Sequence, residues 1–434
     1  MKRVYYTQFI LILFLFSCMD RFTIPSDIES QDSGEFGAGD TVFLELKPLW
    51  NSSYGFDEPE EISVAQDGRI FVADKGNNSI IVLDQDGDRP SGFEKLISLE
   101  DEEANSISPI DVDIDKKMNV FFIDGSQRIF IWNQYWNEME IEKISSSGIF
   151  NHIETNMDTT VEAGTDIWLS LLNDNEWTLI SSEMSDNPTL IDSLTRPHLF
   201  YDGKNEMNVY LDNYYQSDSS QFTGLTAPSD QENMIFLTDN YGGSNNQYRI
   251  VQINFYRSLL LELSSGDTVW AFTGRFGGTV KGFGTGAGTV NQPLSLDVDY
   301  QGNLYYTQAG DYFPIHMISP NLSGDFAIYT SGFQPEADDI MDPEWFSSPL
   351  DIAVDNSRNI YVADGQNMDL TVFNSYGGFF KKAGYQQDSL NIMDQPVAVS
   401  VDQRGIVYVC DRSESAVYRF KLSNTLDEDI IIED

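Results

Sequence analysis

Histidine is the residue most often used for zinc binding and general base catalysis, and the 434-residue chain has only three: His152, His198 and His316. His152 and His198 lie near the starts of strand-like segments, so they are weak candidates for a metal site. His316 lies within the run Pro314–Ile318, at a position that is not equivalent. Neither a Gly-x-Ser-x-Gly nor a His-Glu-x-x-His motif occurs. The sequence therefore identifies no catalytic residue and predicts no cofactor.

Aspartates recur at the ends of similar apolar runs, at Asp74, Asp124, Asp364 and Asp411. An active site needs one constellation of groups, whereas these residues come once per repeat. An Asp at a strand end commonly accepts backbone N–H groups of the next turn. We expect these aspartates to be structural.

Two acidic triplets have the alternation of a calcium loop: Asp84, Asp86 and Asp88, and then Asp111, Asp113 and Asp115. In the first, Arg89 stands where a calcium loop needs Gly and Lys95 where it needs Glu. The second triplet lies on an expected strand. We interpret both as solvated carboxylates and keep calcium as the alternative.

Aromatic and amide residues share several expected loops. Trp136, Tyr214, Tyr215 and Tyr241 could stack on a sugar or anchor a peptide. Ordinary loop chemistry explains them equally well. They are the candidate ligand-binding residues, and an insertion from Tyr214 to Gln231 together with the loop Tyr241–Gln247 would border the site.

Acidic residues dominate the charge, with 69 Asp and Glu against 25 Lys and Arg, a formal net charge of -44. Such a surface repels the phosphates of nucleic acids and anionic lipid headgroups. The charge therefore excludes a nucleic-acid partner, and any membrane contact requires an anchor.

The N-terminus supplies a candidate anchor. Lys2 and Arg3 precede the apolar run Phe9–Phe16, which has the length of a signal-peptide core and is too short to span a bilayer. The ending Leu15-Phe16-Ser17-Cys18 resembles the lipobox of bacterial lipoproteins. The resemblance implies that residues 1–17 are a signal peptide and that Cys18 carries diacylglycerol and further acyl chains such as palmitate.

That interpretation places the protein in the bacterial cell envelope, anchored to a membrane by lipid. Residues 18–40 are polar and are expected to form a flexible tether. An ordinary secretory signal with an incidental cysteine is the alternative. The second cysteine, Cys410, is expected to be a small buried hydrophobe.

A repeated phrase accounts for the rest of the chain. Pro59, Pro109, Pro293, Pro349 and Pro396 each open an alternating apolar and polar run, followed by a tight turn and a second run. Consecutive copies start 50 residues apart at Pro59 and Pro109, and 56 and 47 apart from Pro293 onward. Four strands in a repeat of this length predict a β-propeller blade.

These copies resemble the NHL-repeat family, whose blade reads roughly Pro-x-x-Ile-Ala-Val-Asp, then Gly-Asn-x-Tyr-Val-Ala-Asp. The resemblance covers residues 59–133 and 282–421 and implies an all-β propeller of four-stranded blades. The middle of the chain is degenerate. If the middle forms two blades, the propeller has seven blades, which is the count we prefer. If it forms one expanded blade, the propeller has six.

Ring closure explains both ends of the repeat region. The last copy supplies only three strands, and Thr41–Leu46 is a strand without a blade. Adding it to the last blade pairs both edges. We therefore expect a single propeller over residues 41–425, closed by an N-terminal strand, and an acidic tail at residues 426–434.

Two functions are compatible with this sequence. In the first, which we favour, the propeller is a binding or scaffold module for a protein or glycan partner. In the second, it is a lyase or hydrolase with a site at the mouth of its channel, with or without a metal. Because distant residues converge in a propeller, the absence of a catalytic motif only weakly favours the first.

Overall fold

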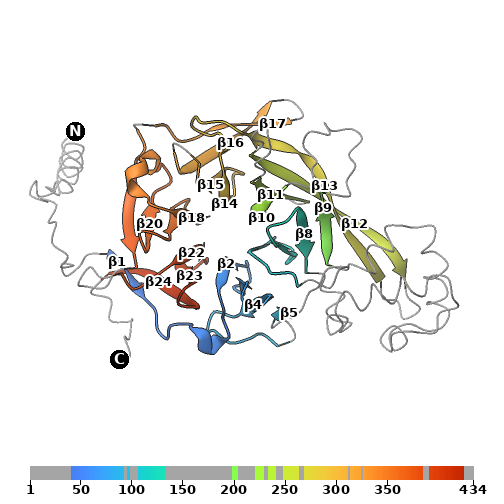
Figure 1. Ribbon diagram of the computed structural model, residues 1–434, viewed down its shortest axis with the longest axis horizontal. Coiled ribbons are helices and arrows are strands. Elements are labelled where there is room, and N and C mark those ends of the chain that lie inside the picture. The colour runs from blue at the N-terminus through green and yellow to red at the C-terminus, as the bar shows by residue number, and fades with distance from the viewer. Residues whose placement is uncertain are drawn as a thin grey trace, which may run out of the picture. The chain divides into compact units, whose positions relative to one another are not determined.

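The computed structural model shows a ring of six four-stranded antiparallel sheets (Figure 1). It describes residues 41–91, 95–97, 106–132, 198–203, 220–228, 233–240, 248–262, 268–310, 313–323, 326–335, 337–384 and 391–424. Within these residues no helix is long and apolar enough to cross a membrane.

The first three blades are built as follows. Blade 1 contains β2 (Pro59–Val64), β3 (Ile70–Asp74), β4 (Ser79–Leu83) and β5 (Lys95–Ile97). Blade 2 contains β6 (Asp111–Ile114), β7 (Val120–Ile123), β8 (Arg128–Ile131) and β9 (Leu199–Asp202). Blade 3 contains β10 (Phe222–Thr226), β11 (Met234–Asp239), β12 (Arg249–Glu262) and β13 (Thr268–Gly282).

The other three blades complete the ring. Blade 4 contains β14 (Pro293–Val298), β15 (Leu304–Gln308), β16 (Ile315–Ser323) and β17 (Phe326–Ser331). Blade 5 contains β18 (Pro349–Val354), β19 (Ile360–Asp364), β20 (Asp369–Phe373) and β21 (Phe379–Ala383). Blade 6 contains β22 (Pro396–Val401), β23 (Ile406–Asp411), β24 (Ala416–Asn424) and β1 (Thr41–Glu45).

Burial explains why the second strand of each blade is the most apolar. Every residue of β3, β15 and β19 is buried, because a neighbouring blade covers each face of the sheet. The apolar clusters accordingly cross from one blade to the next; one of them joins Tyr361 of blade 5, Val409 of blade 6 and Phe43 of β1. The core is therefore a ring of layers between blades.

The preferred count of seven blades is wrong, because the degenerate middle supplies strands to only two. β9 serves as the outer strand of blade 2, although residues 132–198 separate it from β8. The expected insertion Tyr214–Gln231 contains β10, the inner strand of blade 3. This strand lacks the opening Pro, and it carries Gly224 where other blades carry a side chain. A Cβ at Gly224 would lie 2.7 Å from Ser295 Cα and 2.8 Å from the Leu294 carbonyl oxygen, so blade 4 leaves no room for one.

Both ends of the described chain meet in blade 6. β1 pairs antiparallel with β24, Thr41 opposite Asn424 and Glu45 opposite Phe420. Val417 donates its N–H to the Trp50 carbonyl oxygen at 2.7 Å, and the Arg419 guanidinium lies 4.3 Å from the Trp50 ring centroid. These contacts join the segment after β1 to the third strand of the last blade.

The aspartates at the ends of the second strands are structural, as expected. Asp364 accepts the backbone N–H groups of Ser347, Ser348, Gln366 and Asn367, at 2.7–3.1 Å. Asp411 likewise accepts from Asp394, Gln395 and Glu414. In blade 4 the equivalent residue is Gln308, which accepts from Asn291 N at 2.9 Å. The position therefore requires an acceptor and does not require a charge.

Candidate functional site

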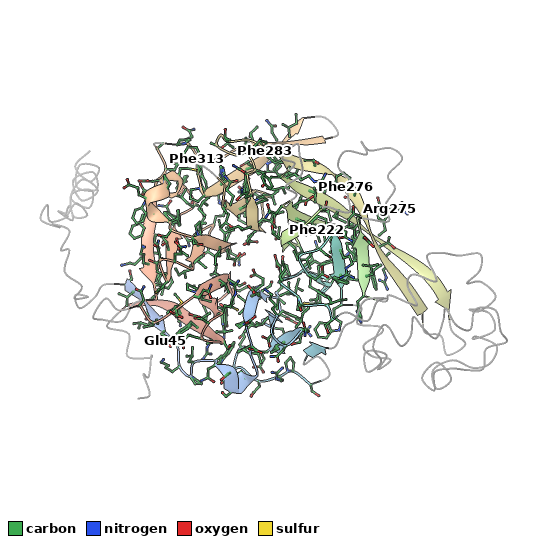
Figure 2. All side chains as sticks on the ribbon, viewed as in Figure 1. Glu45, Phe222, Arg275, Phe276, Phe283 and Phe313 are labelled. Carbon is green, nitrogen blue, oxygen red and sulfur yellow. The ribbon has the colours of Figure 1, made fainter. Side chains whose placement is uncertain are left out.

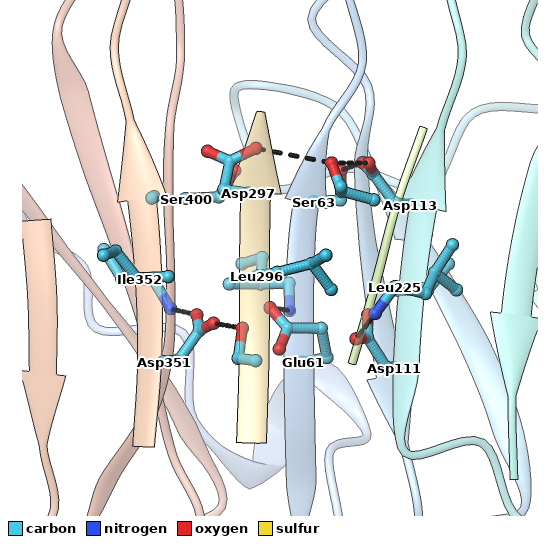
Figure 3. A pocket seen from close by; sticks show the side chains of 16 residues that line it. Glu61, Ser63, Asp111, Asp113, Leu225, Leu296, Asp297, Asp351, Ile352 and Ser400 are labelled. Atoms are coloured by element: carbon cyan, nitrogen blue, oxygen red, sulfur yellow. Dashed lines mark hydrogen bonds between the residues drawn. The ribbon is translucent and has the colours of Figure 1, made fainter. Parts of the chain in front are cut away.

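A small cavity lies in the central channel, between the inner strands of all six blades (Figures 2 and 3). Its volume is about 60 Å³, enough to hold water. Five of the residues around it carry carboxyl groups: Glu61, Asp111, Asp113, Asp297 and Asp351. We call these five the channel carboxylates.

The strand register sorts the lining into two tiers, because alternate residues of an inner strand face the channel. The first tier, two residues after the position of the opening Pro, consists of Glu61, Asp111, Ser295 and Asp351. Gly224 and Ala398 hold the equivalent positions in the other two blades and do not line the cavity. The second tier, two residues further on, consists of Ser63, Asp113, Thr226, Asp297, Ala353 and Ser400. No two blades carry the same pair, so the channel is asymmetric although the fold repeats.

Four of the channel carboxylates connect one blade to the next. Asp111 accepts the Leu225 N–H at 2.6 Å, and Asp113 accepts the Ala227 N–H at 2.7 Å. Asp297 accepts the Val354 N–H at 2.7 Å, and Asp351 accepts the Val399 N–H at 2.6 Å. Inner strands of adjacent blades belong to separate sheets and do not pair with each other, so these carboxyl groups satisfy N–H groups that face the channel.

Glu61 differs from the other four. Within the described residues its carboxylate accepts only the N–H of its neighbour Ile62, at 2.9 Å. It is half-buried, yet it joins no two blades. Burial and the charges of Asp351 and Asp111 hold the pKa of Glu61 well above its usual range.

Thr226 lies between two channel carboxylates in the second tier. Its Oγ1 is 3.3 Å from Asp113 Oδ2 and 3.5 Å from Asp297 Oδ1. A hydroxyl has one hydrogen to donate. These distances are long for O–H···O hydrogen bonds, so the hydroxyl donates to one of the two carboxyl groups at a time.

The surroundings of these two carboxyl groups indicate which one holds the proton. Asp113 accepts from Ser63 Oγ at 2.6 Å, Ile114 N at 2.8 Å and Ala227 N. Burial raises the pKa of Asp113 above its usual value, and these donors, which favour the ionised form, limit the increase. Burial and the nearby charge of Asp113 raise the pKa of Asp297 to about 8. Asp297 also accepts two backbone N–H groups, those of Val298 and Val354, but its pKa lies above neutral pH, which makes it the candidate proton donor.

In the first tier, Asp351 also contacts a hydroxyl group, that of Ser295. Ser295 Oγ donates to its Oδ1, and burial raises the pKa of Asp351 to about 6. Burial and the charge of Asp351 also raise the pKa of Asp111. The cavity therefore holds several carboxyl groups whose pKa values are raised, a property that is common at catalytic sites.

Sequence reasoning missed the channel carboxylates, because it interpreted Asp111 and Asp113 as solvated. Both instead face the cavity, and Asp111 is only 5% exposed. The other triplet is a turn, in which Asp84 accepts from Asp86 N and Asp88 N at 2.9 Å. One sequence signal was present: alternate inner-strand positions carry carboxylates in some blades and small residues in others.

The two histidines that the structure describes do not reach the channel. His198 is buried beside β8 and β9, with Nδ1 3.2 Å from the Ile131 carbonyl oxygen, and burial lowers its pKa to about 4. His316 stacks on Tyr306, accepts from Gly288 N and donates to the Phe313 carbonyl oxygen. His152 lies outside the described residues.

The other predicted site residues are not part of this cavity. Cys18, Trp136, Tyr214, Tyr215 and Tyr241 all lie outside the described residues, so their predicted roles stay predictions. Cys410 is buried in an apolar cluster, as expected, and burial raises its thiol pKa. Among the described residues no group of three His, Cys, Asp or Glu side chains is arranged to hold a metal ion.

No protein-family model matches the chain, and no curated protein is similar to it in sequence. Among solved structures, a gluconolactonase from Xanthomonas campestris is 9% identical and has a TM-score of 0.44, with 89% of this chain and 99% of that chain covered. A streptogramin B lyase is 11% identical and has a TM-score of 0.41, with 88% and 98% covered. A protein of unknown function from Bacteroides thetaiotaomicron is 10% identical and has a TM-score of 0.46, with 90% and 74% covered.

Proposed function

We propose that this protein is a propeller enzyme of the lyase or hydrolase class, with Asp297 as general acid and Asp113 as general base. The observation that carries the proposal is the contact of one hydroxyl, Thr226 Oγ1, with both carboxyl groups. Two carboxyl groups whose surroundings favour opposite protonation states are a recurrent basis for acid–base catalysis.

Two proton transfers define the chemistry. Asp113 would accept a proton from substrate or from an attacking water, and Asp297 would donate one to the leaving group. Thr226 lies between them and could return the proton to Asp297, which restores the starting state. An elimination and a hydrolysis both need these two transfers, so the geometry supports both reaction classes.

The cavity limits what can enter. At about 60 Å³ it admits a reacting group and a few waters, whereas a sugar ring or a peptide segment would remain at the mouth. In the second tier Ser63, Asp113, Asp297 and Ser400 are half-buried and Thr226 and Ala353 are buried, whereas in the first tier only Glu61 is half-buried and Asp111, Ser295 and Asp351 are buried. The reacting group would therefore approach from the second tier, and the acidic lining favours a neutral or cationic substrate.

The proposal is tested by assaying the full chain with a panel of neutral lactones, carboxylic esters and β-elimination substrates. An activity that decreases above about pH 8 is expected, because Asp297 then loses its proton. Asp297→Asn and Asp113→Asn should each lower kcat about 100-fold or more. Ser400→Ala, in the same tier, is the matched control. Unchanged kcat in both carboxyl variants would contradict the assignment.

We further propose that Cys18 is lipidated and holds the protein in the bacterial cell envelope. The lipobox-like ending at Cys18 supports this. Cys18→Ala should release the protein from the membrane fraction, and mass spectrometry of the wild type should find an acylated N-terminal Cys18. A mature N-terminus elsewhere would contradict the proposal. Recognition of a protein or glycan partner by Trp136, Tyr214, Tyr215 and Tyr241 remains a prediction.

We also propose that the blades belong to the NHL-repeat type and that Thr41–Leu46 closes the ring. The pairing of β1 with β24 supports closure. Deletion of residues 41–47 would bare the edge of β24 and should strongly destabilise the propeller. An unchanged urea midpoint for the deletion variant would contradict this role.

A further inference from the structure

Exposed aromatic side chains gather at one end of blade 5. Tyr376 is 78% exposed, Phe379 40% and Phe380 41%. They belong to the turn between β20 and β21 and to the first two residues of β21. We call these three residues the blade 5 aromatic patch.

The patch is held rigidly by the structure beneath it. Asn374 Oδ1 accepts the N–H groups of Tyr376 and Gly378, and Asp339 Oδ2 accepts the Phe379 N–H at 2.8 Å. The Trp345 ring stacks on Phe379 at 4.6 Å between centroids. The hydrogen bonds fix the backbone of the patch and the stacking fixes the Phe379 ring, so these parts lose little conformational entropy on binding.

Strand direction places the patch at the same end of the ring as Thr41, the first described residue. In blades 5 and 6 the third strand begins beside the end of the second, with Asp369 opposite Asp364 and Ala416 opposite Asp411. Its far end pairs with the start of the outer strand, Phe373 with Phe379 in blade 5 and Asn424 with Thr41 in blade 6. β1 also packs against β21, so the two starts belong to adjacent outer strands (Figure 1).

We propose that the blade 5 aromatic patch docks on the membrane interface, a proposal that rests on the lipid anchor at Cys18. Residues 19–40 lie between Cys18 and Thr41 in the sequence, and the tether predicted from their composition would have an end-to-end distance of roughly 25 Å. The anchor therefore brings this end of the ring to the bilayer. Aromatic rings are favoured at the level of the headgroups.

Charge determines which lipid surface the patch fits. The net charge of -44 repels anionic headgroups. Asp339, which holds the Phe379 N–H, and its neighbours Asp338 and Asp342 add to that repulsion beside the patch. The partner is therefore a zwitterionic surface, contacted through the rings, and the contact should depend little on salt.

The test places an environment-sensitive dye in the patch of the full, lipidated chain. Tyr376→Cys is labelled with NBD, since Cys410 is buried and Cys18 is acylated, and the protein is reconstituted in phosphatidylethanolamine–phosphatidylcholine vesicles. We expect blue-shifted emission and at least twofold quenching by spin-labelled lipid. Met368→Cys, in the turn at the opposite end of the same blade and 37% exposed, is the matched control and should stay in water.

Each other outcome has a defined meaning. If the dye on the Tyr376→Cys variant is still quenched after Phe379→Ser and Phe380→Ser, the patch is not what binds the membrane. Water-like emission from a protein that floats with the vesicles would also contradict docking through the patch. A blue shift without vesicles that grows with protein concentration would identify a second copy as the occupant and overturn the lipid proposal. If the protein does not float with the vesicles, the lipid anchor at Cys18 is wrong and the docking proposal fails with it. The acid–base assignment of Asp297 and Asp113 is tested separately by kcat.

Discussion

Two sets of carboxyl groups occupy the propeller, and they differ in how they repeat. The aspartates at the ends of the second strands, such as Asp364 and Asp411, recur from blade to blade and accept several backbone N–H groups each. The channel carboxylates Asp113, Asp297 and Glu61 differ from blade to blade and have unequal numbers of donors.

The comparison distinguishes a requirement of the fold from a property of one site. Gln308 replaces the aspartate in blade 4, so the second-strand position works without charge. In the channel, neutral replacement would change the protonation of the neighbouring groups, since the charges of Asp113 and Asp351 raise the pKa values of Asp297 and Glu61 respectively. Carboxyl groups that recur at the same position in the blades are therefore structural, and those that differ between blades form the candidate site.

The largest effect on stability is expected for Asp364→Ala. This change leaves the N–H groups of Ser347, Ser348, Gln366 and Asn367 without their acceptor and should cost about 3 kcal/mol in urea unfolding. Asp364→Asn is the control and should cost about 1 kcal/mol, because the amide oxygen still accepts. Equal losses in both variants would show that the charge itself is needed and would break the comparison.

A pH-dependent loss of stability is the next largest effect. The unfolded chain ionises Asp297 near pH 4, whereas the folded chain ionises it near pH 8, so the folded state binds the extra proton between these values. Raising the pH from 6 to 8 should therefore remove about 2 kcal/mol of stability through this group. Asp297→Asn should reduce that slope in urea unfolding. A slope identical to that of the wild type would contradict the raised pKa.

A smaller effect is expected for Asp351→Asn. The amide keeps an acceptor for the Val399 N–H and removes the charge that raises the pKa values of Glu61 and Asp111. Stability at pH 8 should increase by about 1 kcal/mol. Thermal unfolding at pH 8 and at pH 5 measures the difference, which should be smaller at pH 5, where the folded state binds a proton at Asp351. Destabilisation at both pH values would mean that Asp351 acts like the second-strand aspartates.

The smallest effect is expected for Glu61→Gln. Its carboxylate joins no two blades among the described residues, so the substitution should change stability by about 0.5 kcal/mol at pH 8, in the stabilising direction. Urea unfolding of this variant beside Asp351→Asn sharpens the ranking within the channel. A loss above that of Asp364→Asn would place Glu61 among the structural residues.

The sequence predicted blades well where their phrase is intact, and in blade 3 it missed the inner strand, β10. Its inner strand has Phe222 in place of the opening Pro and Gly224 where contact with blade 4 leaves no room for a side chain. The site could not be predicted for a different reason. Asp113, Thr226 and Asp297 are 113 and 71 residues apart along the chain and come together only through ring geometry. Alternation along a strand separates its two faces. Which face meets the channel can be decided only when the arrangement of the blades in the ring is known.

The protonation state of Asp297 is the central claim, and it can be measured without a substrate. Carbon-13 NMR of the side-chain carboxyl groups of aspartate-labelled Cys18→Ala protein, with Asp297→Asn to assign the signal, gives the titration directly. We predict a midpoint near pH 8 for Asp297. A midpoint near 4, the value of an ordinary carboxyl group, would show that both carboxyl groups beside Thr226 are ionised at neutral pH and would contradict the account.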